Sequence, residues 1–248
     1  MKNASECAKN LTALRKTLPA PEAPACADQD DPIAVLVLSF LMWESSTDKA
    51  MAAYQRLLES VADFNDLRVC MPHETAGYLG ARYPRVTERS ERLRATLRNI
   101  FLREHAVRLD VLKSATKREI RKYLESLEGM VPYVASRVGL LCFDTHTIPV
   151  DEQLRAQLIA ADAVDEEATV SEISSWLNRQ IKARNGRQTH FALQAWIDEV
   201  DGKTPAGSRR KVTGGDKKAP GKSAGARTRR KRSAAEETAD TTAADPAS

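Results

Sequence analysis

Two features of the sequence have the residue types and spacing to act on a ligand: a glycine turn at Gly129 and a lone carboxylate at Asp151. The turn lies between two predicted helices, where backbone N–H groups can bind a phosphate without a charged side chain. Gly129 would let a phosphate chain approach closely; alternatively, it is the C-cap of an ordinary corner between helices. Asp151 follows the next apolar helix, and by itself it could simply be the N-cap of a helix that begins at Glu152.

Apolar residues at helical spacing, together with capping residues, predict the helices that position these two features. Asp31 and Pro32 open a helix that is apolar on all sides and is therefore expected in the core. Capping boxes at residues 116–119 and 169–172 open two further helices. The predicted helices cover residues 33–43, 47–61, 88–104, 117–124, 132–141, 152–158, 173–181 and 191–197. Because few alternating strand patterns occur, residues 31–200 are predicted to be all-α.

Composition restricts the class of protein. Apolar residues make up 42% of the 248 residues, which is enough for a core. The longest apolar run, residues 33–43, is too short to span a bilayer, and the N-terminus lacks a signal-peptide pattern. We therefore expect a cytoplasmic protein with no membrane partner, located at the nucleoid if it is bacterial. The cysteines are scattered without a C-x-x-C pair, which argues against a disulfide scaffold and a zinc site. They are Cys7, Cys26, Cys70 and Cys142.

The positive charge of the chain is concentrated at its C-terminus. Residues 201–248 hold twelve Lys or Arg and six Asp or Glu, a local charge of +6, whereas the preceding residues carry a net charge of −2. Small, polar and basic residues dominate this tail, which is therefore predicted to be disordered, with an acidic end. Residues 1–30 are predicted to be a flexible N-terminal lead-in, because prolines interrupt their one short amphipathic stretch.

Three stretches of the body occur in an order and at a spacing typical of one known family. They are residues 31–39 followed by 46–50, residues 127–135, and Phe143 followed by 149–151. On these stretches, residues 30–197 resemble the endonuclease III-like superfamily of DNA glycosylases, the helix-hairpin-helix (HhH-GPD) group. The interval from Gly129 to Asp151 fits the spacing of this family without a gap. The resemblance implies an all-α, two-lobed helical bundle that contains a helix-hairpin-helix motif and is followed by the disordered basic tail.

The resemblance also implies roles for individual residues. The catalytic acid of the family falls on Asp151, where it would stabilise the cationic sugar of a flipped nucleotide and help to activate the attacking water. The alternative acid is Asp144, which begins the tripeptide Asp-Thr-His seven residues earlier. The other positions implied to contact DNA are Gly129, Met130 and Val131 in the hairpin, Ser45 as a wedge beside the flipped base, and Tyr133 as a pocket wall that stacks on that base.

The sequence departs from the family pattern in four places. Val131 replaces the second hairpin glycine and Pro132 has no N–H, so phosphate binding should be weaker or differently arranged. Tyr133 replaces the lysine with which strand-cutting members form a Schiff base, so lyase activity is not expected. No cysteine follows Cys142, so neither an iron–sulfur cluster nor another cofactor or metal is expected. Ser45 is small for a wedge.

The basic clusters of the tail could bind nucleic-acid phosphates by counterion release, without reading sequence. They contain Arg209, Arg210 and Lys211, then Arg229, Arg230, Lys231 and Arg232. We expect a monomeric enzyme of base-excision repair that acts on double-stranded DNA: a monofunctional DNA glycosylase, which hydrolyses the N-glycosidic bond of a damaged base, or a degenerate relative. The alternatives are a non-catalytic, architectural DNA-binding protein that uses the helical body and the tail, and an all-α protein-interaction module.

Overall fold

The computed structural model describes residues 4–19 and 30–203, and these residues contain eleven α-helices and no strand. The helices are α1 (Ala4–Thr17), α2 (Pro32–Met42), α3 (Thr47–Ser60), α4 (Phe64–Val69), α5 (Pro72–Leu79), α6 (Val86–Glu104), α7 (Lys117–Glu125), α8 (Pro132–Phe143), α9 (Glu152–Ala160), α10 (Val170–Gln180) and α11 (Gly186–Lys203). Two short 3₁₀ helices, η1 (Asp110–Ser114) and η2 (Ala183–Asn185), connect them. The all-α prediction is therefore confirmed for the described residues.

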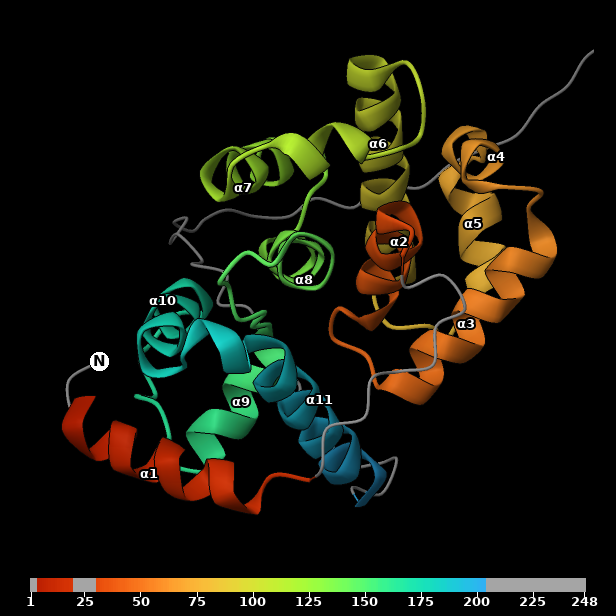
Figure 1. The fold of residues 1–248 in the computed structure, drawn as a ribbon. Coiled ribbons are helices and arrows are strands. Elements are labelled where there is room, and N and C mark those ends of the chain that lie inside the picture. Colours follow the sequence, from red (N-terminus) through yellow and green to blue (C-terminus); the bar gives the residue numbers. More distant parts are fainter. Residues whose placement is uncertain (1–3, 20–29, 204–248) are drawn as a thin grey trace, which may run out of the picture. The chain divides into compact units, whose positions relative to one another are not determined.

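The helices bury two separate hydrophobic cores, which define two lobes (Figure 1). Helices α2 to α8 surround the first core, and α1 packs with α9, α10 and α11 around the second. Helix α2 runs through the first core with every residue buried, as its uniformly apolar sequence predicts. Asp31 caps this helix by accepting the N–H of Ile33 at 2.8 Å, and Pro32 occupies its first turn. Helix α2 packs on α8, so the two helices that lead to the candidate site share one core.

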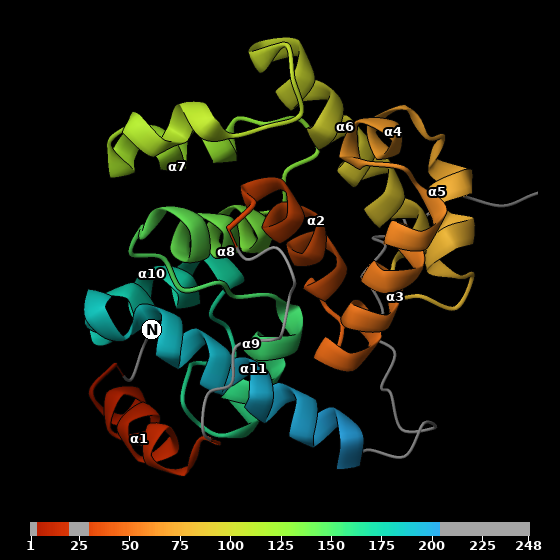
Figure 2. The same cartoon turned by 45° about the vertical axis from the view of Figure 1, so that its right-hand side comes forward.

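Helix α1 belongs to the second lobe. Cys7 and Leu11 are buried in its core, and Asn10 Nδ2 donates to the carbonyl oxygen of Asp162 at 2.9 Å. Figures 1 and 2 both show α1 beside the helices of this lobe. Residues 4–17 therefore differ from the flexible lead-in that the sequence predicts, because their apolar face packs on residues far along the chain. A local pattern carries no signal for such a partner.

Two short helices of the first lobe, α4 and α5, have no counterpart among the predicted helices. They contain six and eight residues, too few turns for apolar spacing to stand out. None of the helices in the described part of the chain is long and apolar enough to cross a membrane. The predictions for the tail, including its disorder and its basic clusters between Arg209 and Arg232, fall outside the described residues.

Candidate functional site

Asp151 lies at the junction of the two lobes. It is the N-cap of α9, where extended backbone (φ −125°, ψ −178°) lets Oδ1 accept the N–H of Leu154 at 2.9 Å. Its Oδ2 accepts the N–H of Glu44 at 2.9 Å, in the turn that follows α2. Asp151 is only 6% exposed. One carboxylate therefore caps a helix of the second lobe and binds the backbone of the first.

The charge state of Asp151 follows from this environment. Burial raises the pKa of Asp151 to about 6, because the carboxylate has lost most of its water. The N–H groups of Leu154 and Glu44 lower the pKa, and the nearby Glu44 carboxylate raises it. Glu44 is itself paired with Arg85 at 2.7 Å. Above pH 6 the acid is mostly ionised, which is the form that can stabilise a cation.

Tyr133 lies in the first turn of α8, with 4% of its surface exposed. Its hydroxyl donates to Gln194 Oε1 on α11 across a long contact of 3.4 Å, and burial raises its pKa. Asp198, one turn further along α11, accepts from Gln194 Nε2 at 3.4 Å and from the N–H of Thr47 on α3 at 2.9 Å. Helix α11, which belongs to the second lobe, therefore contacts two helices of the first lobe. Gln194 and Asp198 are absent from the predicted site, because their i, i+4 spacing indicates only a shared helix face and does not show which helices that face contacts.

The hairpin between α7 and α8 is docked on α6. Gly129 has a φ of +75°, in the left-handed region that favours glycine. A Cβ at this position would lie 2.6 Å from the carbonyl oxygen of Arg92, and the neighbouring carbonyl of Glu128 accepts from Thr96 Oγ1 at 2.8 Å. The close approach that Gly129 permits is therefore to the backbone of α6. The packing on α6 accounts for a glycine at this position without a phosphate, and the phosphate contact of Gly129 stays a prediction.

The remaining hairpin and wedge positions are mostly covered. Val131 is the buried N-cap of α8, Met130 is half-buried and Pro132 is exposed. Ser45 is buried, and its N–H donates to the carbonyl of Met42 at 3.1 Å. A wedge has to reach the surface, so Ser45 would need a change in the turn after α2 to enter a duplex.

Asp144, the alternative acid, lies on the surface. It is the C-cap of α8, with φ +50°, and its exposed carboxylate pairs with Arg187 at 2.8 Å. The ring of His146 is bonded through Nε2 to the carbonyl of Asn178 at 2.8 Å. No group of three or more His, Cys, Asp or Glu side chains among the described residues is arranged to hold a metal. Burial and a position between the lobes make Asp151 a better candidate than Asp144 for the acid implied by the sequence.

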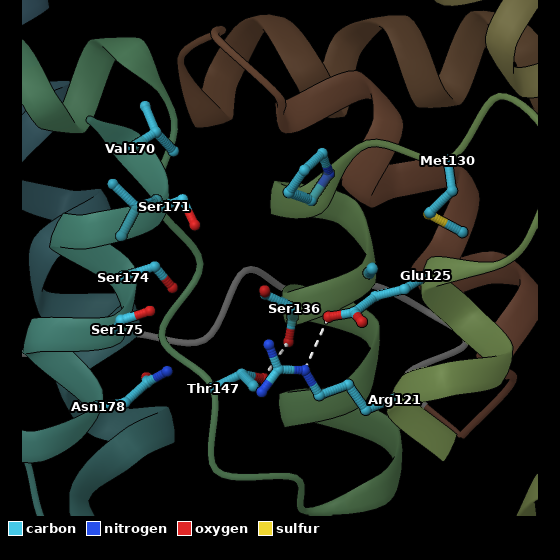
Figure 3. Close-up of a pocket in the computed structure, with 13 residues that line it drawn as sticks. Arg121, Glu125, Met130, Ser136, Thr147, Val170, Ser171, Ser174, Ser175 and Asn178 are labelled. Atoms are coloured by element: carbon cyan, nitrogen blue, oxygen red, sulfur yellow. Dashed lines mark hydrogen bonds and ion pairs between the residues drawn. The ribbon is translucent and has the colours of Figure 1, made fainter. Parts of the chain in front are cut away.

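A cavity of about 380 Å³ lies beside the loop that carries the acid. Its volume falls within the range of roughly 300–1,000 Å³ that is common for ligand pockets. Figure 3 shows its polar walls, formed by Ser171, Ser174, Ser175 and Asn178 of α10, Ser136 of α8 and the Arg121–Glu125 ion pair of α7. Val150 also lines it, whereas Asp151 and Tyr133 do not. The cavity therefore adjoins the residue before the acid without reaching the acid itself.

No protein-family model matches the sequence, and a search of curated proteins finds no match. The fold does match solved structures. A trapped endonuclease III–DNA covalent intermediate has a TM-score of 0.55 and 13% identity, over 78% of this chain and 84% of its own. A thermostable thymine-DNA glycosylase has a TM-score of 0.51 and 14% identity, over 78% of this chain and 83% of its own. The chain has the endonuclease III-like glycosylase fold.

A third structure with this fold is the 8-oxoguanine glycosylase/lyase of Clostridium acetobutylicum in complex with double-stranded DNA. Its TM-score is 0.50 at 15% identity, and the match covers 69% of this chain and 60% of that protein. Within its endonuclease III-like fold, the present chain places Asp151 and Tyr133 near enough for the charge of the acid to raise the pKa of the phenol. Gly129 packs against α6.

Proposed function

We propose that this chain binds duplex DNA and removes a base by hydrolysing its N-glycosidic bond, without cutting the strand and without a cofactor. The observation that carries the proposal is the placement of Asp151, a buried carboxylate held between the two lobes of an endonuclease III-like fold. A solved endonuclease III with this fold was trapped as a covalent intermediate with DNA, which supports DNA as the partner.

Asp151 would supply the electrostatic part of the reaction. As the base leaves, positive charge develops on the sugar, and a preorganised carboxylate nearby stabilises that charge. The same group can orient or deprotonate the attacking water. Because Asp151 is 6% exposed in the free chain, DNA binding has to open the junction and release the hydrogen bond from Glu44.

Tyr133 occupies the position that decides whether the chain can cut the DNA strand. Strand cutting in this fold depends on an amine that forms a Schiff base with the abasic sugar, and a phenol cannot form one. In the free chain, Tyr133 is tied to Gln194 and shielded from solvent. We therefore expect an abasic site in an intact strand as the product.

The test is base release from duplexes that each carry one damaged base, scored as strand breaks after hot alkali. The full-length chain is compared with Asp151→Asn and with a matched control, Asp63→Asn, which alters the exposed N-cap of α4. Asn caps helices about as well as Asp, so both variants should fold. We expect a loss of at least about 100-fold for Asp151→Asn, the scale of one electrostatic contribution, and little change for Asp63→Asn. Equal activity of wild type and Asp151→Asn would remove Asp151 from the mechanism.

A second candidate function, non-catalytic DNA binding, is favoured by one observation. Asp151 and Tyr133 are both buried, and the cavity nearby is lined by neither. An architectural protein needs the helical body but no pocket at the acid. In the same experiment, neither wild type nor the variants would release a base. A binding titration with the same duplexes would show equal affinity for damaged and intact DNA.

A further inference from the structure

Arg89, in the first turns of α6, is fully buried and bonded to carbonyl groups of the main chain. Its guanidinium donates to the carbonyls of Phe40, of Trp43 at 2.6 Å and of Pro84 at 3.2 Å. The first two belong to the C-terminal end of α2, where carbonyls have no partner within the helix. None of the ion pairs found in the described residues includes Arg89, so its charge acts on backbone dipoles.

The carbonyl of Trp43 and the N–H of Glu44 are the two ends of one peptide group. The carbonyl accepts from Arg89 at 2.6 Å, and the N–H donates to Asp151 Oδ2 at 2.9 Å. A buried cation and a buried carboxylate are therefore joined through a single peptide. Hydrogen bonds in such a chain polarise one another, which strengthens each by roughly 10–30%.

From this arrangement we infer that Arg89 is a positioning residue, which acts through the Trp43–Glu44 peptide to fix Asp151 in place and to favour its charged form in the free chain, before DNA opens the junction. The inference deepens the proposed function and rests on it for its biological meaning, although the coupling itself is a property of the free chain.

The backbone of the turn supports this reading. Glu44 adopts a φ of +51°, a left-handed conformation that is strained for a residue other than glycine. Such a conformation persists only where surrounding contacts hold it, and here Arg89 and Asp151 hold the two ends of the preceding peptide. The aromatic rings of Trp43 and Tyr83 lie 5.5 and 5.0 Å from the guanidinium carbon and restrict its movement.

Other charged and titratable groups face Asp151 from the neighbouring elements, and their influence on its charge has to be distinguished from that of Arg89. Glu44 lies in the same turn and Arg85 of α6 neutralises it at 2.7 Å. Tyr133 of α8 is a phenol that is neutral at physiological pH, and burial raises its pKa further. Asp198 of α11 is bound to the N–H of Thr47. None of these groups binds the Trp43–Glu44 peptide that donates to Asp151, whereas Arg89 does.

The test measures the pKa of Asp151 directly, by titrating its carboxyl carbon signal by NMR in the full-length chain. Arg89→Lys keeps the charge but lacks the planar fork that binds two carbonyls. We expect the pKa of Asp151 to rise by about half a unit to one unit, since a weakened hydrogen bond to the charged form disfavours that form. The matched control is Arg92→Lys, which alters an arginine of the same helix that is bonded to Glu88 and should leave the pKa of Asp151 unchanged.

A second measurement needs no variant. In the wild-type chain, the amide proton of Glu44 and the guanidinium signals of Arg89 should both shift with the midpoint of the Asp151 titration. Unchanged Arg89 signals across that titration, or an unchanged pKa of Asp151 in a folded Arg89→Lys variant, would overturn the inference. These readouts do not depend on base release. A chain that shows the coupling but releases no base therefore contradicts only the proposed function.

Discussion

Gly129 offers the sharpest test of how the hairpin is used. Gly129 packs directly against the backbone of α6, which leaves no room for a side chain. An added Cβ would lie 2.6 Å from the Arg92 carbonyl oxygen and 3.1 Å from the Cβ of Ala95. The hairpin is also held there by the hydrogen bond from Thr96 to Glu128. Gly129→Ala should therefore destabilise the fold, whether or not DNA is present.

The expected size follows from two contributions. Placing alanine at a φ of +75° costs roughly 1–2 kcal/mol, the penalty of left-handed backbone for an L-residue. Relieving the contact with a backbone carbonyl costs a further 1–3 kcal/mol or so, as in other overpacked sites. The reduced entropy of the unfolded chain returns about 0.4–1 kcal/mol. The net loss is roughly 1–5 kcal/mol, which corresponds to a fall in Tm on the order of 2–20 °C for a chain of this size.

The assay is thermal and urea unfolding followed by circular dichroism. Gly77→Ala is the matched control, because Gly77 lies in α5, is exposed, and has nothing within 4 Å of an added Cβ. Alanine there should raise stability by roughly 0.5–1 kcal/mol, since glycine is a poor helix former. The two substitutions should therefore act in opposite directions. If Gly129→Ala is as stable as wild type, the packing of the hairpin on α6 is not what requires a glycine.

Three further outcomes are expected. First, the pKa of Asp151, about 6 in the folded chain, lies above the unfolded value of about 3.9, so the folded state binds this proton more tightly. Wild type should lose up to about 3 kcal/mol relative to Asp151→Asn as pH rises from 4 to 6, and a pH-independent difference in urea midpoints would contradict this. Second, if the tail engages three or four phosphates, log K for duplex DNA should fall with log salt at a slope of roughly −3 to −4. Replacing Arg229, Arg230, Lys231 and Arg232 with serine should flatten that slope, whereas an unchanged slope would exclude a contribution from this cluster. Third, wild type should give no borohydride-trapped DNA complex, and Tyr133→Lys should give one, because it restores an amine that can form a Schiff base; trapping by wild type would point to another amine.

The elements that carry a strong local pattern are the ones that the sequence predicts well. Helix α2 is apolar on every side and is entirely buried, and the caps at Asp31, Thr116 and Thr169 all make their expected side-chain bonds. The helix-cap role of Asp151 is predictable for the same reason, because an acid directly before a helical run can accept an N–H group of the first turn.

Features that depend on distant partners are not predictable in this way. Gln194 and Asp198 matter because α11 packs beside α8 and the start of α3, and no local pattern states which helices meet. The role of Gly129 depends on Arg92, nearly forty residues earlier. The sequence of a turn that contains glycine does not indicate whether the glycine packs on a phosphate or on another helix. Arg89 illustrates the limit most clearly, since a charged residue in an Arg-rich helix has no sequence mark that distinguishes a buried position from an exposed one.

The two hydrogen bonds of Asp151 also indicate how a buried acid could become available without losing its position. The bond from Leu154 lies within the α9 cap, whereas the bond from Glu44 crosses to the other lobe. If DNA binding opens the junction, as the proposed function requires, Oδ2 would be released while Oδ1 stays fixed by the helix. The freed oxygen would then face the bound nucleotide. The positive charge that develops on its sugar would take the place of the Glu44 N–H group as the partner of Oδ2. An acid oriented in this way needs no amine beside it for base removal, so tyrosine at position 133 would abolish strand cutting and still leave hydrolysis possible.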